Sequence, residues 1–381
     1  MDFGLTEEQE LFRKTVRDFA EAEIAPRAAE LDEKGEFPYD IVSKMAELGL
    51  LGLPIPEEYG GCGADMVTYC IGIEEISRVS ASLGITMAAH TSLGCMPIYL
   101  FGNEEQKRKW LVPLARGEML GSFGLTEPEA GSDARATKTT AVLDGDEWVI
   151  NGTKVFITNS GTRISGVVTI TAVTGENEKG KEISNIIIPH GTPGLEIAPP
   201  YRKMGWRYSD TRELSFVDCR VPKENLLGER GGGLRAFLRV LDCGRIGVAA
   251  LSVGLAQACL EESVKYAKER VQFGEPIGKK QGVSFKCADM YMEVELARLA
   301  TYKAAWVADQ GRRYTREASI AKLFASETAM RAASAAVQIH GGYGYIEDYP
   351  VCRYFRDAKI LEIGEGTSEI QRLVLTRHLG L

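Results

Sequence analysis

The feature that most constrains the fold is a change in the spacing of apolar residues, which occurs twice along the 381-residue chain. In the first 120 residues, apolar side chains such as Phe12, Val16 and Phe19 recur every three or four positions, as on the buried face of a helix. Between about 137 and 217 they alternate in short runs bounded by Gly, Pro or Asn, as in strands. From Leu234 the helical spacing returns. This order predicts an α+β fold with helices and strands in separate layers.

Local signals place individual elements within this pattern. The sequence from Thr6 to Gln9 has the form of a capping box, which predicts a helix start, and another helical pattern covers about 66–79. Extended runs alternate with the pairs Asp144-Gly145 and Asn151-Gly152, which predicts consecutive hairpins and an antiparallel sheet. We therefore expect an N-terminal all-α domain over 1–120, a central antiparallel β domain over 121–231 and a C-terminal helical bundle over 232–381.

Composition narrows the class of partner. The chain has 45 basic and 53 acidic residues, a formal charge of −8, and no polybasic run, which argues against nucleic acid as a partner. The acidic segment Met1–Gln9 does not resemble a targeting peptide, and no apolar stretch is expected to be long enough to span a membrane. These features predict a cytoplasmic enzyme, with a processed organellar enzyme as the alternative.

Histidine and cysteine spacing argues against a metal site. The four histidines have no histidine three or four positions away, and the eight cysteines form no Cys-x-x-Cys pair. We expect no bound metal and reduced thiols.

Two glycine-rich segments could carry chemistry, but their residues alone leave the question open. The loop Gly124–Asp133 offers hydroxyls and backbone N–H groups to a flavin or a phosphate, yet it could equally be an ordinary interdomain loop. Glu365 stands between Gly364 and Gly366, where a carboxylate can approach a ligand or simply be solvated. No Gly-x-Gly-x-x-Gly or P-loop motif is present, so any nucleotide cofactor must be held in another way.

Six segments together resemble the successive signatures of the acyl-CoA dehydrogenase family. They are Gly124–Asp133, Phe156–Thr158, Leu241–Ile246, Arg270–Gly274, Gln338–Gly342 and Ile363–Gln371. They occur in the family's order along essentially the whole chain. The resemblance implies the family's fold, with an N-terminal helical domain, a central β domain and a C-terminal four-helix bundle.

The resemblance also implies which residues bind FAD and the acyl-CoA substrate. The family's FAD contacts match Phe123, Leu125, Thr126, Ser132, Phe156, Ile157, Thr158, Arg270, Phe273, Gln281, Gln338, Ile339, Gly341, Gly342, Thr367 and Glu369. Its substrate contacts match Ser132, Asp242, Arg245, Gly364 and Gly366. The contacts at Arg270, Gln281 and 338–342 are made across a dimer interface in the family, which implies a homotetramer built as a dimer of dimers.

In the family's reaction, Glu365 matches the catalytic base that removes the α-proton of the thioester, while the β-hydrogen passes as hydride to N5 of FAD. The product is the 2-enoyl-CoA, and the electrons pass to an electron-transferring flavoprotein. A minority of members carry the base on the Leu241–Arg245 segment, at the position that is Gly244 here, so Glu365 has no rival.

Two departures from the family pattern bear on the substrate. Phe156 replaces a common Trp, which implies altered redox tuning with FAD binding retained. Gly364 replaces a Tyr that walls the acyl pocket in many straight-chain enzymes, so either the pocket is wider, for a short, branched or alicyclic acyl group, or other side chains refill the space.

Two other functions on the same fold compete with a dehydrogenase. An acyl-CoA oxidase or flavin monooxygenase would pass the electrons to dioxygen, although those oxidases usually carry an extra C-terminal domain. A noncatalytic nucleic-acid-binding relative would need a basic groove, which the charge of −8 does not favour.

Overall fold

The computed structural model describes residues 4–178 and 180–381. The first helical layer contains α1 (Glu7–Phe19), α2 (Ala28–Lys34), α3 (Tyr39–Glu47), α4 (Met66–Val79), α5 (Ala81–Ala89), α6 (Met96–Phe101), α7 (Glu104–Gln106) and α8 (Val112–Ala115). The capping box is confirmed, because the Thr6 hydroxyl accepts from the Gln9 N–H and the Gln9 side-chain oxygen accepts from the Thr6 N–H, both at 3.2 Å.

The strands and the later helices follow in the expected order. The strands are β1 (Leu120–Gly124), β2 (Thr140–Asp144), β3 (Glu147–Thr158), β4 (Ser165–Asn177), β5 (Gly180–Pro189), β6 (Leu195–Ile197), β7 (Thr211–Pro222) and β8 (Leu226–Leu227). The second helical layer contains α9 (Gly233–Glu269), α10 (Gln281–Asp309), α11 (Thr315–His340), α12 (Pro350–Ala358) and α13 (Ser368–His378), with the short pair β9 (Val271–Gln272) and β10 (Glu275–Pro276) after α9. The predicted α+β fold class is confirmed.

The sheet has eight strands in the order β6-β7-β3-β2-β4-β5-β8, with β1 beside β4. Most strand pairs are antiparallel, as expected, but β1 pairs with β4 in parallel and β2 pairs with β4 in parallel at one residue pair. A tight hairpin forces antiparallel pairing only on the two strands that it joins. Strands β1 and β4 are separated in the chain by the β2–β3 hairpin, so no tight turn joins them and they can pair in parallel.

The turn predicted at Asn151-Gly152 is also absent, since β3 runs straight through it. The register between β3 and β7 shifts between Ile150 and Gly152, where Gly152 has φ +149°. A Cβ at Gly152 would lie 2.5 Å from the Thr139 hydroxyl oxygen. The glycine therefore permits a bulge and a close approach between strands, and it does not reverse the chain.

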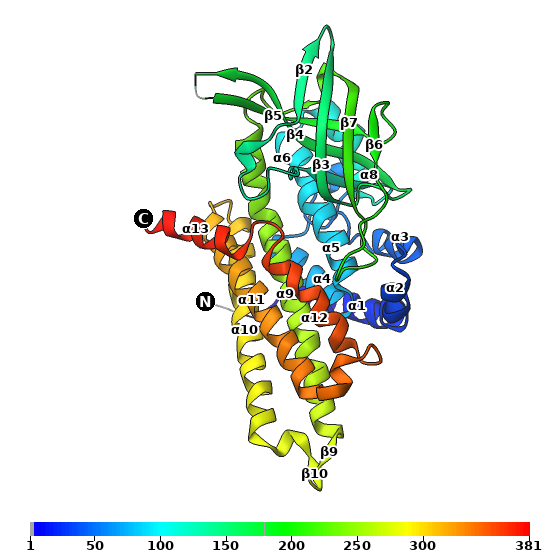
Figure 1. Cartoon of the computed structure of the whole chain (residues 1–381), viewed down its shortest axis with the longest axis vertical. Coiled ribbons are helices and arrows are strands. Elements are labelled where there is room, and N and C mark those ends of the chain that lie inside the picture. The colour runs from blue at the N-terminus through cyan, green and yellow to red at the C-terminus, as the bar shows by residue number, and fades with distance from the viewer. Residues whose placement is uncertain (1–3, 179) are drawn as a thin grey trace.

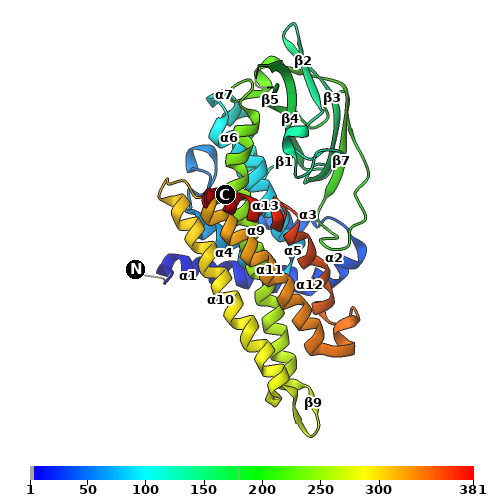
Figure 2. The same ribbon diagram turned by 60° about the vertical axis from the view of Figure 1, so that its left-hand side comes forward.

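The long helix α9 connects the two ends of the molecule. Figures 1 and 2 show the sheet at one end and the tips of α9 and α10, with β9 and β10, at the other. Helix α9 has 37 residues and packs against α4, α10 and α11 in the main hydrophobic core. Alanines such as Ala325 and Ala329 on α11 are fully buried, which allows these helices to pack closely.

Helix α9 also corrects one sequence expectation. By length and composition it is apolar enough to cross a membrane, but 94% of its most apolar window is buried inside the molecule. Its apolar residues are therefore accounted for by the protein core.

Candidate functional site

Glu365 lies on a left-handed turn. The turn follows the short 3₁₀ helix Lys359–Glu362 and precedes helix α13. Glu365 has φ +55° and Gly366 has φ +90°. A left-handed conformation costs a non-glycine residue roughly 1–2 kcal/mol, so the surrounding contacts must hold it. Thr367 then caps α13 by accepting from the Ile370 N–H at 3.3 Å.

Two buried side chains hold this turn by its carbonyl groups. The ammonium group of Lys322 on α11 donates to the Gly366 carbonyl at 2.8 Å. The amide nitrogen of Gln371 on α13 donates to the carbonyls of Glu365 at 3.2 Å and Gly366 at 2.9 Å. Both Lys322 and Gln371 are fully buried. The turn is therefore fixed by donors from two different helices.

The carboxylate of Glu365 faces α9 without a hydrogen-bond partner. Its Oε2 atom is buried, and no partner for it is found in the described part of the chain. A Cβ at Gly244 would lie 2.6 Å from this oxygen, so the glycine provides the space that the carboxylate occupies. Burial raises the pKa of Glu365 to about 7, although the nearby charges of Arg245 and Lys322 act in the opposite direction. A carboxylate with such a pKa is suited to act as a general base near neutral pH.

Two predicted substrate residues lie beside Gly244 on α9. The Arg245 guanidinium donates to the Asp242 carboxylate at 2.8 Å, and the Thr315 hydroxyl donates to the other Asp242 oxygen at 2.5 Å. Arg245 is buried, and its Nε has no partner among the described residues. The structure thus brings Asp242 and Arg245 together with the turn that carries Gly364, Glu365 and Gly366.

The predicted flavin loop is anchored to β3 by a buried ion pair. The Lys154 ammonium lies 2.7 Å from the Glu127 carboxylate and donates to the Leu125 carbonyl at 3.1 Å. Glu127 also accepts the backbone N–H groups of Lys138 at 2.7 Å and Thr139 at 3.1 Å. Burial lowers the pKa of Lys154 to about 8, and the Glu127 charge opposes this shift.

Next to this loop, β3 presents an exposed aromatic ring. Phe156 has φ +63°, is 65% exposed and packs against Tyr201 with ring centroids 5.3 Å apart. Three predicted residues are half-buried: Leu125 and Thr126 on the loop and Thr158 at the end of β3. Ile157 is buried in the core of the sheet, and Ser132 is exposed on the loop. An exposed ring beside half-buried hydroxyl groups suits a planar, polar-edged ligand such as a flavin.

Helix α9 relates the flavin loop to Glu365. Phe123 on β1 packs against Phe237 on α9 with ring centroids 4.8 Å apart and planes tilted by 32°, and Gly244, seven residues after Phe237, faces Glu365. Seven residues are about two helical turns, roughly 10 Å along the axis. The two groups of predicted residues therefore flank the same stretch of α9.

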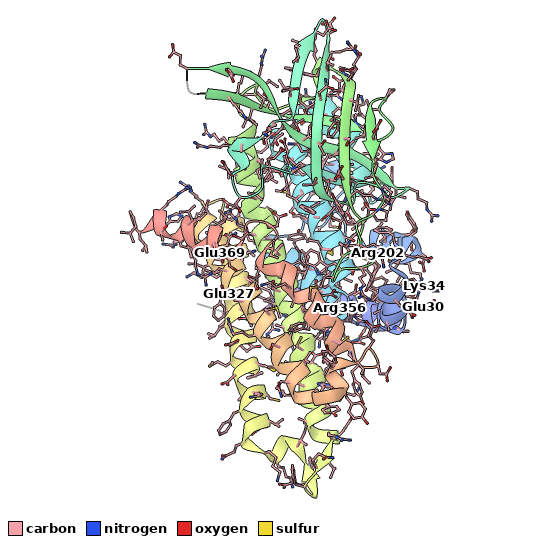
Figure 3. All side chains as sticks on the ribbon, in the orientation of Figure 1. Glu30, Lys34, Arg202, Glu327, Arg356 and Glu369 are labelled. Atoms are coloured by element: carbon pink, nitrogen blue, oxygen red, sulfur yellow. The ribbon has the colours of Figure 1, made fainter. Side chains whose placement is uncertain are left out.

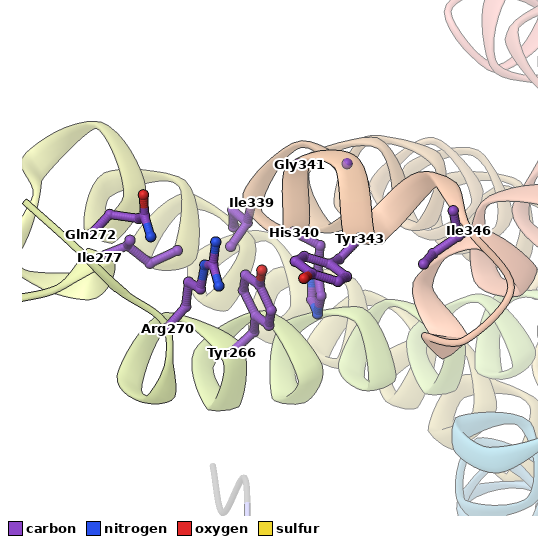
Figure 4. A pocket seen from close by; sticks show the side chains of 10 residues that line it. Tyr266, Arg270, Gln272, Ile277, Ile339, His340, Gly341, Tyr343 and Ile346 are labelled. Carbon is purple, nitrogen blue, oxygen red and sulfur yellow. The ribbon is translucent and has the colours of Figure 1, made fainter.

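A third group lies at the far end of α9, around a cavity of about 480 Å³ (Figure 4). The cavity is lined by Tyr266, Arg270, Gln272, Ile277, Ile339, His340, Gly341, Gly342, Tyr343 and Ile346. A Cβ added to Gly341 or Gly342 would meet nothing within 4 Å, so a ligand can approach this backbone. The Arg270 guanidinium lies 5.5 Å from the centre of the Tyr343 ring. A cation, open glycine backbone and aromatic rings fit a dinucleotide.

The remaining predicted cofactor residues are divided between these places. Phe273, which is 93% exposed, and Gln281 lie at the same end as the cavity without lining it, and Gln338 precedes Ile339 on α11. Thr367 is the N-cap of α13 and follows the Glu365 turn directly. Glu369 lies in the first turn of α13 (Figure 3). From Phe237 to Arg270 the rise along α9 is roughly 50 Å, so one chain does not bring the cavity and the flavin loop together.

Sequence reasoning missed several residues of these groups. His340 lies within the segment Gln338–Gly342 and Tyr343 directly follows it, so their place in the sequence could have indicated them. Tyr266 precedes Arg270 by about one helical turn, so its spacing could have indicated it. Lys322 was missed because a lysine in an alanine-rich helix usually faces solvent. Its signal was its place on the stripe of buried Ala318, Ala325 and Ala329.

Comparisons with known proteins cover the entire described fold. Family models for the N-terminal, middle and C-terminal domains of acyl-CoA dehydrogenases match residues 6–118, 122–219 and 231–380. A probable acyl-CoA dehydrogenase of Bacillus subtilis strain 168 is 56% identical, with 100% of both chains covered. A short-chain specific acyl-CoA dehydrogenase of Clostridium acetobutylicum is 49% identical, with 99% of each chain covered.

Solved structures agree with these relatives. Butyryl-CoA dehydrogenase from Megasphaera elsdenii has a TM-score of 0.97 at 45% identity, covering 100% of both chains. A chain from a structure of the electron transferring flavoprotein of Acidaminococcus fermentans has a TM-score of 0.96 at 46% identity, covering 100% of this chain and 99% of that one. An acyl-CoA dehydrogenase from Bacillus anthracis complexed with FAD has a TM-score of 0.91 at 36% identity, covering 98% and 67%. The chain therefore belongs to the acyl-CoA dehydrogenase family of FAD-dependent oxidoreductases.

Proposed function

We propose that this enzyme dehydrogenates a short acyl-CoA thioester between its α and β carbons, and that Glu365 is the base. The observation that carries the proposal is the buried, unpartnered Oε2 of Glu365, held opposite Gly244 on a turn between two glycines. Such a carboxylate can take a proton from carbon without first breaking a hydrogen bond of its own.

The proposed reaction breaks one C–H bond at the α carbon and one at the β carbon. The α C–H bond breaks and its proton passes to Glu365, while a double bond forms between the α and β carbons. FAD, when bound, supplies the oxidant, since it accepts the β-hydrogen together with its electron pair. The flavin end of FAD would be held by Phe123, Leu125, Thr126, Ser132, Phe156, Ile157, Thr158, Thr367 and Glu369. Its adenosine end would be held by Arg270, Phe273, Gln281, Gln338, Ile339, Gly341 and Gly342.

The backbone of the Glu365 turn can also assist proton removal. The carbonyls of Glu365 and Gly366 accept from Lys322 and Gln371, whereas no acceptor for the Glu365 N–H is found within residues 4–178 and 180–381. A free N–H beside the base can donate to the thioester oxygen as negative charge develops there. Asp242, Arg245 and Ser132 would contact the CoA portion.

The acyl group is proposed to be short, with room for a branch or a ring. Two of the relatives are named for short-chain or butyryl substrates. At Gly364, an added Cβ would meet only the Ile360 carbonyl, at 3.6 Å, so the first atom of a larger side chain would meet no side chain beyond its chain neighbours. This geometry supports the wider-pocket interpretation of Gly364.

The partners are proposed on similar grounds. The distance between the flavin loop and the cavity at Arg270 exceeds the length of one extended dinucleotide, so a single FAD could contact both groups only if they belong to different subunits. This supports an assembly of at least two subunits, and we propose the homotetramer, a dimer of dimers, that the family resemblance implies. The flavoprotein structure among the neighbours supports an electron-transferring flavoprotein as the acceptor, and the bacterial relatives support a cytoplasmic location.

Anaerobic reduction of the bound flavin tests this proposal. Straight, branched, alicyclic and aromatic acyl-CoA esters are mixed with the enzyme, and bleaching of the flavin absorbance is recorded. We expect bleaching by short and branched esters; bleaching by straight C4 to C8 esters alone would contradict the Gly364 argument. Rapid reoxidation by air after reduction would replace the dehydrogenase assignment with an oxidase.

A further inference from the structure

Lys322 is the one buried cation that joins the bundle to the Glu365 turn by a hydrogen bond in the described part of the chain. We propose that Lys322 is a positioning residue which, together with Gln371, holds the Glu365–Gly366 turn so that the base faces the substrate side of α9. This inference rests on the proposed function.

The hydrogen bonds support a holding role. Lys322 reaches the turn from α11 and Gln371 reaches it from α13, and both donate to the same Gly366 carbonyl. These part-buried carbonyl oxygens would otherwise lose their protein donors, and an unsatisfied buried acceptor costs roughly 1–3 kcal/mol, which is the upper limit here. The left-handed backbone at Glu365 and Gly366 is thereby fixed from two sides.

The charge of Lys322 adds a second effect. The groups that act electrostatically on Lys322 are Glu365 on the turn, Arg245 on α9, Glu362 before the turn and Glu369 on α13. Cys243 on α9 also interacts with Glu365. Because Lys322 does not bond to the carboxylate itself, its charge favours the ionised form of Glu365 without occupying the oxygen that must take the proton.

A neutral hydrophobic side chain would have satisfied packing at this site. Position 322 lies on a stripe of buried alanines on α11, and burial lowers the pKa of Lys322 to about 8. Burying an ammonium group is costly unless it is paired and hydrogen-bonded. Retention of a lysine at a position suited to an apolar residue is therefore explained by its contact with the turn.

The experiment compares three FAD-loaded variants with the wild type. Lys322→Met removes the donor and the charge, Lys322→Gln removes the charge but keeps a donor, and Gln371→Leu removes a neutral donor. Ser326→Ala is the control, because Ser326 is a buried polar residue one turn further along α11 whose hydroxyl, among the described residues, donates to the Leu323 carbonyl of its own helix and not to the turn. Two readouts are used: amide hydrogen exchange over residues 363–368, which needs no substrate, and the pH profile of anaerobic flavin reduction.

We expect faster exchange over 363–368 in Lys322→Met and Gln371→Leu, and flavin reduction slowed roughly 10²-fold, as for a base displaced by about 1 Å. Loss of the positive charge should also move the acidic limb of the profile to higher pH in both Lys322 variants, but not in Gln371→Leu. Ser326→Ala should match the wild type in both readouts.

Unchanged exchange in Lys322→Met overturns the proposal, and so does faster exchange with wild-type flavin reduction at every pH. If Lys322→Met does not fold, Lys322→Gln is used in its place. An acidic limb of the pH profile that stays at its wild-type position in Lys322→Gln would then overturn the proposal. Should the wild type fail to be reduced by any acyl-CoA ester, the proposed function fails, while hydrogen exchange still decides whether Lys322 holds the turn.

Discussion

Among the described residues, the buried lysines Lys154 and Lys322 each lie near a glutamate, and the two sites differ in what the carboxylate contacts. In the flavin loop, Glu127 bonds directly to Lys154 and accepts two backbone N–H groups. At the Glu365 turn, Lys322 bonds to a backbone carbonyl instead, and Oε2 of Glu365 has no partner in the described chain. Both lysines have a pKa lowered to about 8 by burial.

The carboxylates respond in opposite directions. Burial by itself would raise the pKa of Glu127, but Lys154 and the N–H donors outweigh it, so the pKa lies below its ordinary value. For Glu365 burial prevails, and the pKa rises to about 7. A carboxylate whose oxygens are satisfied stabilises a loop, whereas one left unsatisfied beside a cation is available for proton transfer.

The largest test of this difference is Glu365→Gln. Removing the base should slow anaerobic flavin reduction by roughly 10⁴-fold, the upper end of what a positioned general base contributes. Thermal stability and FAD content should be retained, because Oε2 of Glu365 has no hydrogen-bond partner within the described residues that the substitution could remove. Stopped-flow absorbance measures the rate, and near-normal reduction would refute the assignment of the base.

The matching change in the flavin loop is Lys154→Met. It leaves Glu127 charged and buried without its partner, which should cost about 3 kcal/mol of unfolding free energy or more. We expect a lower melting temperature and weaker FAD retention, since Lys154 also holds the Leu125 carbonyl.

The exposed pair Lys138–Glu129, whose atoms are 3.4 Å apart, provides the control for this change. Lys138→Met should leave the melting temperature nearly unchanged, because exposed ion pairs contribute little. Equal effects of the two substitutions would show that the buried pair has no special role.

A smaller effect is expected from Gly244→Ala. The added methyl group would start 2.6 Å from Oε2 of Glu365 and must displace it, so flavin reduction should slow by up to roughly 10²-fold. Stability should not fall through the backbone, since alanine is the better helix former. Gly247→Ala is the matched variant, because its methyl group would meet the Tyr69 hydroxyl at 3.1 Å instead. An effect of Gly247→Ala equal to that of Gly244→Ala would argue against displacement of the carboxylate.

The smallest effect is the pH dependence of the wild type. Glu365 must be ionised to accept a proton, so flavin reduction should fall about tenfold per unit as the pH drops below about 7. Glu127 has a lowered folded pKa, so its contribution to stability is present above its unfolded pKa near 4.5 and is lost only as the pH falls through the lower, folded value. Rate and melting temperature measured from pH 8 to 5.5 should therefore separate, with the rate falling while this pair continues to stabilise the fold.

Much of the fold follows from local signals in the sequence. The capping residues Thr6 and Gln9 and the apolar spacing of 66–79 predict helices that the structure contains, because these signals act within a few residues. The turn at Asn151-Gly152 was mispredicted, since the glycine is required by Thr139 on a neighbouring part of the sheet. Such a contact depends on tertiary packing and has no local signature.

The site shows the same division. Glu365 and its two glycines are adjacent in the sequence and were found through a motif. Lys322 lies 43 residues before Glu365, and Gly244 lies 121 residues before it, so their contacts with the turn arise only when α9, α11 and the turn pack together. Sequence could indicate an unusual lysine on an apolar stripe, but not the carbonyl that it reaches.

The continuity of α9 places a limit on how this enzyme can be recombined with its relatives. Gly244 lies in the first third of α9, and Arg270 follows its last residue, 26 residues further along the chain. Inserting a single residue between them would rotate everything beyond it by about 100° and advance it by about 1.5 Å, so Arg270 would leave its cavity. Chimeras should therefore preserve the residue count of α9 and place their junctions in loops such as 310–314 between α10 and α11.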